Sequence, residues 1–131
     1  MLDVSKTIAL VAHDAKKDAL VAWACRHHDE LVKHRLFATG TTGGRLIADA
    51  DLQVELLRSG PHGGDAQIGA MIAEHRLDGL VFFIDPLSAV PHDVDVKSLL
   101  RLAILYDTLL AVNEASATML FKNAFDKESG A

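Results

Sequence analysis

The sequence predicts an α/β fold, a single domain in which a five-stranded parallel sheet carries helices on both faces. Short apolar runs alternate along the chain with longer segments that carry apolar residues at helical spacing. The first run is continuous and apolar, which is typical of a strand buried on both faces of a parallel sheet. The length of 131 residues, half of them hydrophobic, suits one domain with a substantial core.

The first half of the chain contains three predicted strands. Residues 7–12 (TIALVA) form the first, and a helix is predicted over 15–28 because leucine, tryptophan and alanine recur there on one side. The second strand, 36–38, is short and runs into a segment of threonines and glycines. A short helix over 45–50 then leads into the third strand, 52–57.

The second half continues the alternation. Isoleucine and methionine at helical spacing predict a helix that ends near residue 76, and 79–84 (GLVFFI) is the most hydrophobic strand. Leucines and an alanine predict a helix over 96–106, and a fifth strand follows at 109–112. The last predicted helix covers 115–122, and we expect the polar tail beyond it to fray.

Every unusual polar cluster in the chain directly follows a predicted strand. These clusters are residues 13–14 (HD), 39–44 (TGTTGG), 59–65 (SGPHGGD) and 85–95 (DPLSAVPHDVD). In a parallel sheet the carboxyl ends of the strands share one edge, and ligands of such folds bind outside that edge. The sequence therefore predicts one functional site formed by these four segments.

Two of the four segments suit a phosphate group. Residues 39–43 (TGTTG) provide hydroxyls and unhindered backbone N–H groups, and 59–65 provide a serine, three glycines and a helix start. The first segment is not a P-loop, because no Gly-Lys-Ser/Thr follows it. Taken alone it is equally consistent with a plain capped turn, whereas the two segments together favour a phosphate.

Lys17 and three aspartates near the strand ends each have two interpretations. Lys17 lies one helical turn beyond the first strand, within reach of the predicted site, yet most lysines on helix surfaces are merely solvated. Asp14 and Asp65 are placed either to cap a helix or to act in the site. Asp85 before a proline is typical of a turn. If Asp65 acts chemically, a potential base lies beside the phosphate-binding segments.

His92, Asp93 and Asp95 form a compact polar group after the fourth strand. A carboxylate beside a histidine fixes the tautomer and orientation of the imidazole, as a catalytic histidine requires. A metal site is the competing interpretation, but the seven histidines are scattered and no HExxH or Cys/His ligand spacing occurs. We therefore expect no metal.

Composition argues against several function classes. The formal net charge of −5, without a basic block, disfavours nucleic acid and membrane surfaces as partners. No apolar run approaches the roughly 20 residues that span a bilayer, and no signal-peptide pattern is present. The single cysteine, Cys25, excludes an internal disulfide and favours a cytoplasmic protein. Its place beside Trp23 predicts a small core residue.

Four motifs, taken in order, resemble methylglyoxal synthase. They are residues 8–14 (IALVAHD), 38–43 (ATGTTG), 59–65 (SGP and GGD, on either side of residue 62) and 82–96 (with FF, DPL, PH and DV). The resemblance extends from about residue 7 to 118. It implies a Rossmann- or flavodoxin-like domain similar to the regulatory domain of carbamoyl-phosphate synthetase, usually assembled as a homohexamer. Members of this family convert dihydroxyacetone phosphate to methylglyoxal and inorganic phosphate without a metal or organic cofactor.

The resemblance also implies residue roles. Asp65 becomes the base that removes a proton from the carbon next to the substrate carbonyl, and His92 the electrophile at the carbonyl and hydroxyl oxygens. The residues implied around the phosphate are Lys17, Thr39, Gly40, Thr41, Thr42, Ser59 and Gly60. His13 lines the substrate site, and the supporting carboxylates are Asp14, Asp85 and Asp95. Inorganic phosphate would then be both product and inhibitor.

Two other functions stay open at this point. A regulatory domain that binds a phosphorylated or nucleotide effector would share the fold, but such a domain does not need a base such as Asp65 beside the phosphate. A flavodoxin-like signalling domain would leave the two phosphate-binding segments unexplained. The chain departs from the family at Val112, where a threonine is common, and no arginine follows Arg101.

Overall fold

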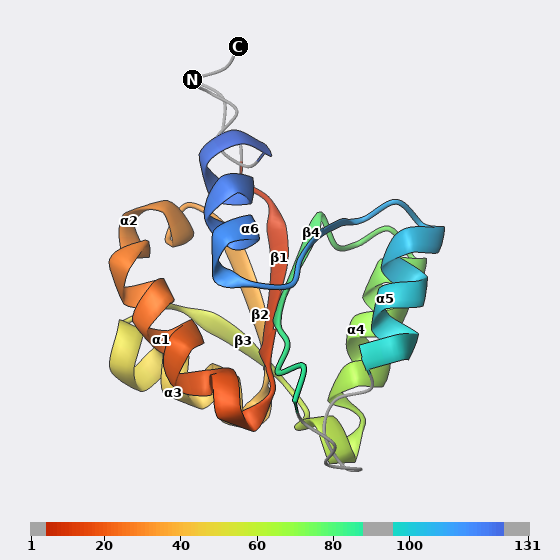
Figure 1. Cartoon of the computed structure of the whole chain (residues 1–131), viewed down its shortest axis with the longest axis horizontal. Coiled ribbons are helices and arrows are strands. Elements are labelled where there is room, and N and C mark those ends of the chain that lie inside the picture. The colour runs from red at the N-terminus through yellow and green to blue at the C-terminus, as the bar shows by residue number, and fades with distance from the viewer. Residues whose placement is uncertain (1–4, 88–95, 125–131) are drawn as a thin grey trace.

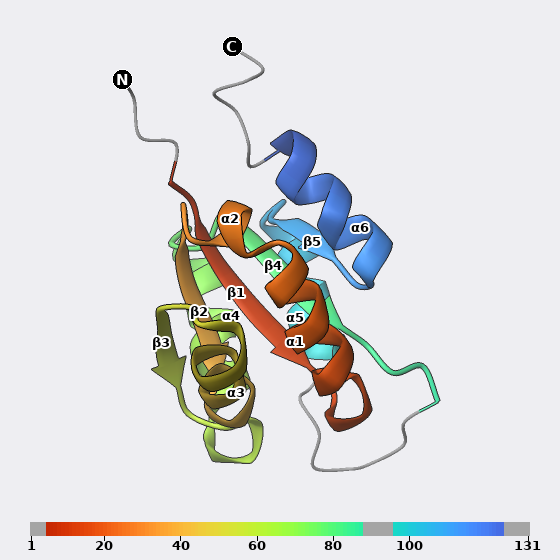
Figure 2. The same ribbon diagram turned by 90° about the vertical axis from the view of Figure 1, so that its left-hand side faces the viewer.

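The computed structural model describes residues 5–87 and 96–124 and contains a five-stranded sheet in which all strands are parallel. The spatial order of the strands is β3-β2-β1-β4-β5 (Figure 2). Their bounds are β1 Thr7–Ala12, β2 Arg35–Thr39, β3 Val54–Leu57, β4 Gly79–Phe83 and β5 Leu109–Ala111. The predicted fold class is confirmed.

Helices cover both faces of this sheet (Figure 1). One face carries α1 (Lys17–Arg26), α2 (His28–Leu31) and α3 (Gly40–Ala50), and the other carries α4 (Gly64–Ala73) and α5 (Val96–Leu105). The chain then returns to the first face with α6 (Glu114–Met119). Because all five strands are parallel, the turns that follow them lie at the same edge of the sheet.

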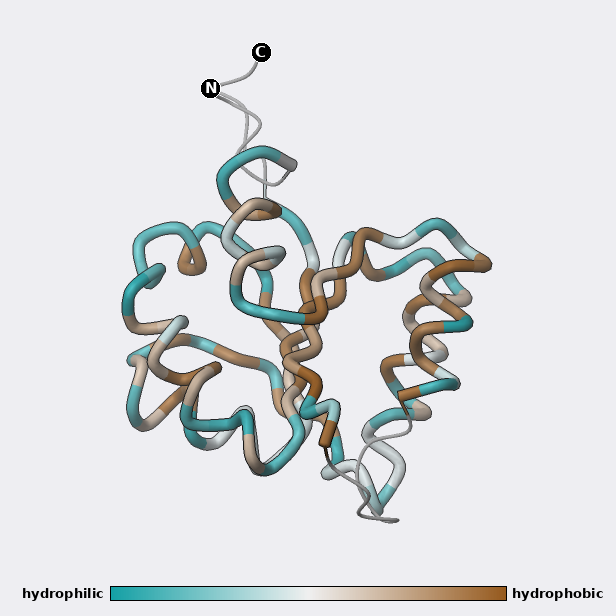
Figure 3. The backbone as a smooth tube through the Cα atoms, viewed as in Figure 1, coloured by the Kyte–Doolittle hydropathy of each residue, from teal (hydrophilic) through white to brown (hydrophobic). Residues whose placement is uncertain are grey.

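The two faces of β1 explain why its sequence is apolar throughout. Ile8 and Leu10 are buried against α1, α3 and α6, while Ala9 and Val11 are buried against α4 and α5. Figure 3 shows the hydrophobic colour concentrated along the central strands. Side chains alternate between the faces of a strand, so a central strand with helices on both sides has no solvent-facing position.

The strand order reverses direction between β1 and β4. From β1 the chain moves outward to β2 and β3, and it then returns to β4 and continues to β5 on the other side. The connections after β1 and β4 therefore leave in opposite directions. In open parallel sheets this reversal is where ligands bind, outside the carboxyl ends of the strands.

The segment after β2 differs from the prediction. Residues 40–44, expected to be a loop before a helix at 45, form the first turns of α3, which begins at Gly40. Gly43 serves close packing here: a Cβ at this position would lie 2.3 Å from Leu56 Cδ2 on β3. The sequence predicted a turn at this glycine, whereas in the structure it lets a helix approach a strand.

Cys25 also differs from the prediction, because it is exposed and not a core residue. Helix α1 buries Leu20, Val21, Trp23 and Ala24, and the next residue along turns away from the sheet toward α3. The Cys25 thiol lies 3.4 Å from the carbonyl oxygen of Asp49. The predicted first helix is moreover divided into a 3₁₀ turn at Asp14–Lys16, α1 and α2.

Within residues 5–87 and 96–124, none of the helices has both the length and the apolar character needed to cross a bilayer.

Candidate active site at the carboxyl edge of the sheet

His13 directly follows β1, beside the end of β4, and is 5% exposed. The backbone N–H of Asp85, which follows β4, donates to Nδ1 of His13 over 2.8 Å. The ring also meets Phe82 edge-on, with 5.2 Å between the ring centroids. Because Nδ1 accepts a hydrogen bond, the neutral imidazole carries its proton on Nε2. His13 is thereby held as a hydrogen-bond donor.

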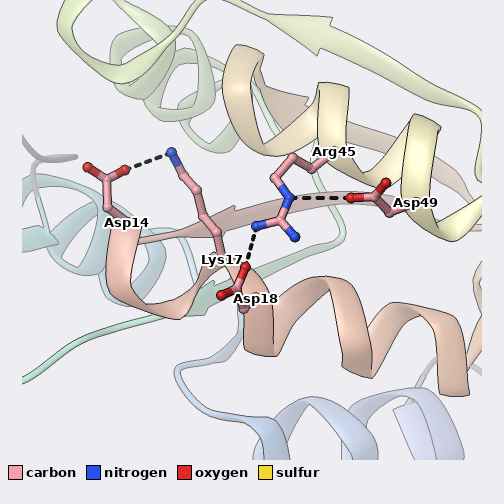
Figure 4. A network of polar contacts seen from close by, with 5 residues as sticks. All are labelled: Asp14, Lys17, Asp18, Arg45 and Asp49. Atoms are coloured by element: carbon pink, nitrogen blue, oxygen red, sulfur yellow. Dashed lines mark hydrogen bonds and ion pairs between the residues drawn. The ribbon is translucent and has the colours of Figure 1, made fainter.

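Lys17 contributes a cation at the same edge (Figure 4). Its Nζ lies 2.7 Å from Asp14 Oδ1, and its side chain is 18% exposed, whereas that of Asp14 is 78% exposed. Arg45 on α3 is bound instead by Asp18 and Asp49, at 2.6 and 3.4 Å. The hydrogen bond with Asp18 raises the pKa of Arg45 above its ordinary value. The two cations shown in Figure 4 thus have different carboxylate partners.

The start of α3 provides buried hydroxyls. Thr39 is the N-cap, in an extended conformation, and both it and Thr42 are buried. Among the described residues, Thr42 Oγ1 is the one buried side-chain oxygen without a hydrogen-bond partner. Such a group costs free energy in the protein alone. An acceptor from a ligand would satisfy it.

The turn after β3 packs directly against this helix start. A Cβ at Gly64 would lie 2.0 Å from the carbonyl oxygen of Arg58 and 2.9 Å from Thr39 Cγ2. A Cβ at Gly40 would lie 3.4 Å from the backbone nitrogen of Ser59. Glycine at 64 therefore lets the two segments meet, as expected of segments that share one ligand.

Asp65 follows this close contact and lies in the first turn of α4, half-buried. The N-cap of α4 is Gly63, whose φ is +103°, so Asp65 is not the capping residue. Its Oδ1 accepts from the backbone N–H of Ala66 over 2.9 Å. The carboxylate thus stands at a helix N-terminus, where a negative charge is stabilised.

Comparisons with known proteins identify the family of this chain. Residues 19–112 match the family described as the MGS-like domain. Methylglyoxal synthase of Rhizobium rhizogenes is 59% identical over 118 residues, which cover 89% of this chain and 94% of the relative. The chain belongs to the methylglyoxal synthase family. The enzyme of Actinobacillus pleuropneumoniae is 48% identical, with 98% of this chain and 86% of that relative covered.

A solved structure supports the same family. The methylglyoxal synthase of Elizabethkingia anophelis matches with a TM-score of 0.90 at 48% identity, covering 95% of this chain and 82% of that one. The family assignment confirms the predicted enzyme class, a carbon–oxygen lyase. It does not test the roles of individual residues, which stay predictions.

The structure brings most of the residues predicted for a methylglyoxal synthase site to one edge. They follow β1 (His13, Asp14, Lys17), β2 (Thr39, Gly40, Thr41, Thr42), β3 (Ser59, Gly60, Asp65) and β4 (Asp85). Asp85 has a more specific place than predicted: its backbone orients His13, and its Oδ1 accepts from the N–H of Leu87 over 3.0 Å. His92, Asp93 and Asp95 lie outside the described residues.

The sequence analysis assigned no function to two side chains that make contacts at this edge. Gln67 Oε1 accepts from the backbone N–H of Arg58 over 2.7 Å, which ties the end of β3 to α4. His62 Nδ1 lies 2.8 Å from Ser59 Oγ. The signal for His62 was present, since the residue stands inside a motif used for the prediction. Nothing in the sequence pattern indicates the contact of Gln67.

The described part of the chain shows no group of three or more histidine, cysteine, aspartate and glutamate side chains arranged to hold a metal ion.

Proposed function

We propose that this member of the methylglyoxal synthase family converts dihydroxyacetone phosphate to methylglyoxal and inorganic phosphate. The observation that carries the proposal is the position of Asp65. This carboxylate follows directly on the glycine turn that packs against Thr39, which supports the proposal that a base acts beside the segments predicted to bind phosphate. A site that only binds a phosphorylated effector would not need a base there.

The phosphate group is expected to bind at the start of α3. Backbone N–H groups at a helix N-terminus favour an anion, and the Thr42 hydroxyl is a buried donor without a partner in the described structure. Lys17 supplies the positive charge from the neighbouring strand end. Because product phosphate would use the same donors, we expect it to compete with the substrate.

Asp65 is proposed to remove a proton from the hydroxymethyl carbon next to the carbonyl group. A carboxylate is a weak base toward carbon. The step therefore requires strong stabilisation of the developing enediolate oxygen by preorganised donors. His13 offers a suitable N–H at Nε2, because Asp85 occupies its Nδ1. His92 is proposed as a second donor on the basis of the family resemblance.

Elimination completes the proposed reaction. The electron pair of the enediolate expels the phosphate from the adjacent carbon, the carbon–oxygen bond breaks, and the resulting enol takes up a proton to give methylglyoxal. Triosephosphate isomerase forms a comparable enediolate with a glutamate base and a neutral histidine, but it returns the proton to carbon. Here the donors around the phosphate would stabilise the departing group. A homohexameric assembly and a cytoplasmic location remain predictions from the resemblance and the composition.

Phosphorus NMR with dihydroxyacetone phosphate and no added metal tests this function. The wild type and an Asp49→Asn control, which changes an exposed carboxylate of α3, should release inorganic phosphate together with methylglyoxal. Asp65→Asn should turn over about 10² to 10⁴ times more slowly, the usual contribution of a general base, and should still bind phosphate. Unchanged substrate with the wild type would favour the effector-binding domain. Near-normal turnover by Asp65→Asn would remove Asp65 from the mechanism.

A further inference from the structure

His62 contacts the phosphate-binding edge without having a task in the proposed reaction. Its Nδ1 lies 2.8 Å from Ser59 Oγ, the hydroxyl predicted to bind phosphate. Ser59 is half-buried and His62 is exposed. The imidazole is therefore accessible to protons from solvent while it contacts a group that faces the ligand.

The backbone keeps this pair together. The N–H of His62 donates to the carbonyl oxygen of Ser59 over 3.0 Å, and the N–H of Gly64 donates to the same oxygen over 2.9 Å. The close approach of Gly64 to Arg58 and Thr39 leaves this turn little room to shift. Ser59 and His62 thus stand at a fixed distance on one short turn.

The protonation state of the imidazole decides what the Ser59 hydroxyl can offer a ligand. If Nδ1 carries no proton, the hydroxyl donates to the ring and presents only lone pairs to a phosphate oxygen. A protonated ring carries N–H at both nitrogens, so Nδ1 must donate to Oγ. The serine proton is then available to the phosphate, and the ring adds a positive charge beside it.

We propose that His62 is a positioning residue that makes phosphate binding at Ser59 depend on protonation. The ligand is a phosphate group, either free or as part of a phosphate monoester, and it binds more tightly when His62 is protonated. The proposal rests on the proposed function, because it assigns a regulation to the same phosphate site. The contribution of His62 to the affinity should fall as the pH rises and the imidazole loses its proton.

Other charged groups surround this turn. Among the described segments that pack against it, they are Arg58 at the end of β3 and Asp65 in the first turn of α4. Phosphate itself also changes charge in this pH range. All of these are common to wild type and a His62 variant, so the ratio of the two dissociation constants at each pH isolates His62.

Calorimetric titration of inorganic phosphate at about pH 5.5 and about pH 8 measures this ratio. His62→Asn retains a polar group near Ser59 but does not titrate. We expect it to bind phosphate about tenfold more weakly than wild type at the lower pH and about equally at the higher pH. A tenfold loss is at the low end for a hydrogen bond to a charged group. His28→Asn is the matched control, since His28 Nε2 also makes one hydrogen bond, to the carbonyl oxygen of Asp51. It should bind like wild type at both pH values.

A ratio for His62→Asn that is the same at both pH values would overturn the proposal. A second background tests the route through the hydroxyl: in Ser59→Ala, adding His62→Asn should change the affinity less than about twofold at the lower pH. A full tenfold change there would also overturn the proposal, because the charge would then act without Ser59. If wild type turns over substrate and binds phosphate, either result leaves the proposed function intact. Failure of wild type in both assays would overturn the two together.

Discussion

Polar side chains are satisfied differently at the carboxyl edge of the sheet and on its outer strand pair, β2 and β3, called the β2–β3 edge below. On β2, Arg35 binds both carboxylate oxygens of Glu55 on β3, at 2.5 and 3.1 Å, and its guanidinium lies 4.9 Å from the centre of the Phe37 ring. Both charged side chains are more than half exposed. At the carboxyl edge, by contrast, Thr42 is 1% exposed and its hydroxyl has no partner among the described residues.

The difference separates groups that satisfy each other within the fold from groups that we propose bind a ligand. An exposed ion pair contributes little to stability, because water and salt screen it, and its two partners already satisfy each other. A buried hydroxyl without a partner costs stability until a ligand supplies an acceptor. Substitutions at the two edges should therefore have different effects on ligand binding, and even on the sign of the stability change.

The largest effect is expected from Gly64→Ala. The new Cβ would collide with the carbonyl oxygen of Arg58, so the free energy of unfolding should fall by about 1–3 kcal/mol, and phosphate binding should be lost as the turn moves. Gly44→Ala is the control, because a Cβ there meets nothing within 4 Å and α3 should gain up to about 1 kcal/mol. Denaturant titration measures both. Equal stabilities for the two variants would mean that the close contact at Gly64 is not real.

Replacing one cation at each edge compares them directly. Lys17→Met should raise the dissociation constant of phosphate at least about tenfold, because a charge-assisted contact is lost. Arg35→Met should leave this constant unchanged, since Arg35 is the first residue of β2 and lies at the opposite, amino end of the strands. Calorimetry on both variants gives the answer. An unaffected Lys17→Met protein would place the phosphate elsewhere.

The central strands were predictable because burial on both faces leaves a direct mark on their composition. Residues 7–12 are β1 at the predicted bounds, since a central strand between two helical layers admits only apolar side chains. The start of α3 was not predictable in this way. Glycine and threonine favour turns locally, and only the neighbouring β3 reveals that Gly43 accommodates Leu56.

The site shows the same limit. That four polar segments share an edge followed from the parallel strands, and the structure agrees for the parts it describes. The contact between His13 and Asp85 joins residues 72 positions apart and exists because β1 and β4 are neighbours. Local pattern carries no information on that strand order, so the tautomer of His13 required the structure. The exposure of Cys25 likewise depended on the rotation of α1.

Thr42→Val should separate stability from binding. Removing the unpartnered hydroxyl should raise the free energy of unfolding of the ligand-free protein by about 1 kcal/mol and weaken phosphate binding about tenfold. Thr118→Val is the matched control: Thr118 Oγ1 accepts from Trp23 Nε1 over 3.1 Å, so its loss should destabilise the protein and leave phosphate binding unchanged. Thermal unfolding with and without phosphate measures both quantities. A destabilised Thr42→Val protein would show that the hydroxyl has a partner within the fold.

The smallest effect is expected from Glu55→Gln at the β2–β3 edge, on the pH dependence of the unfolding temperature. The hydrogen bond from Arg35 holds the pKa of Glu55 below its ordinary value of 4.5. Since the folded-state pKa is the lower one, the ionised carboxylate stabilises the fold above about pH 4.5, and this contribution is lost as the pH falls through the folded-state pKa. Wild type should therefore unfold at a slightly higher temperature than Glu55→Gln at neutral pH, and the two should converge in acid and in about 1 M salt. A difference that persists in acid would show that Glu55 supports the edge by packing, in which case the contrast between the two edges would not be one of charge.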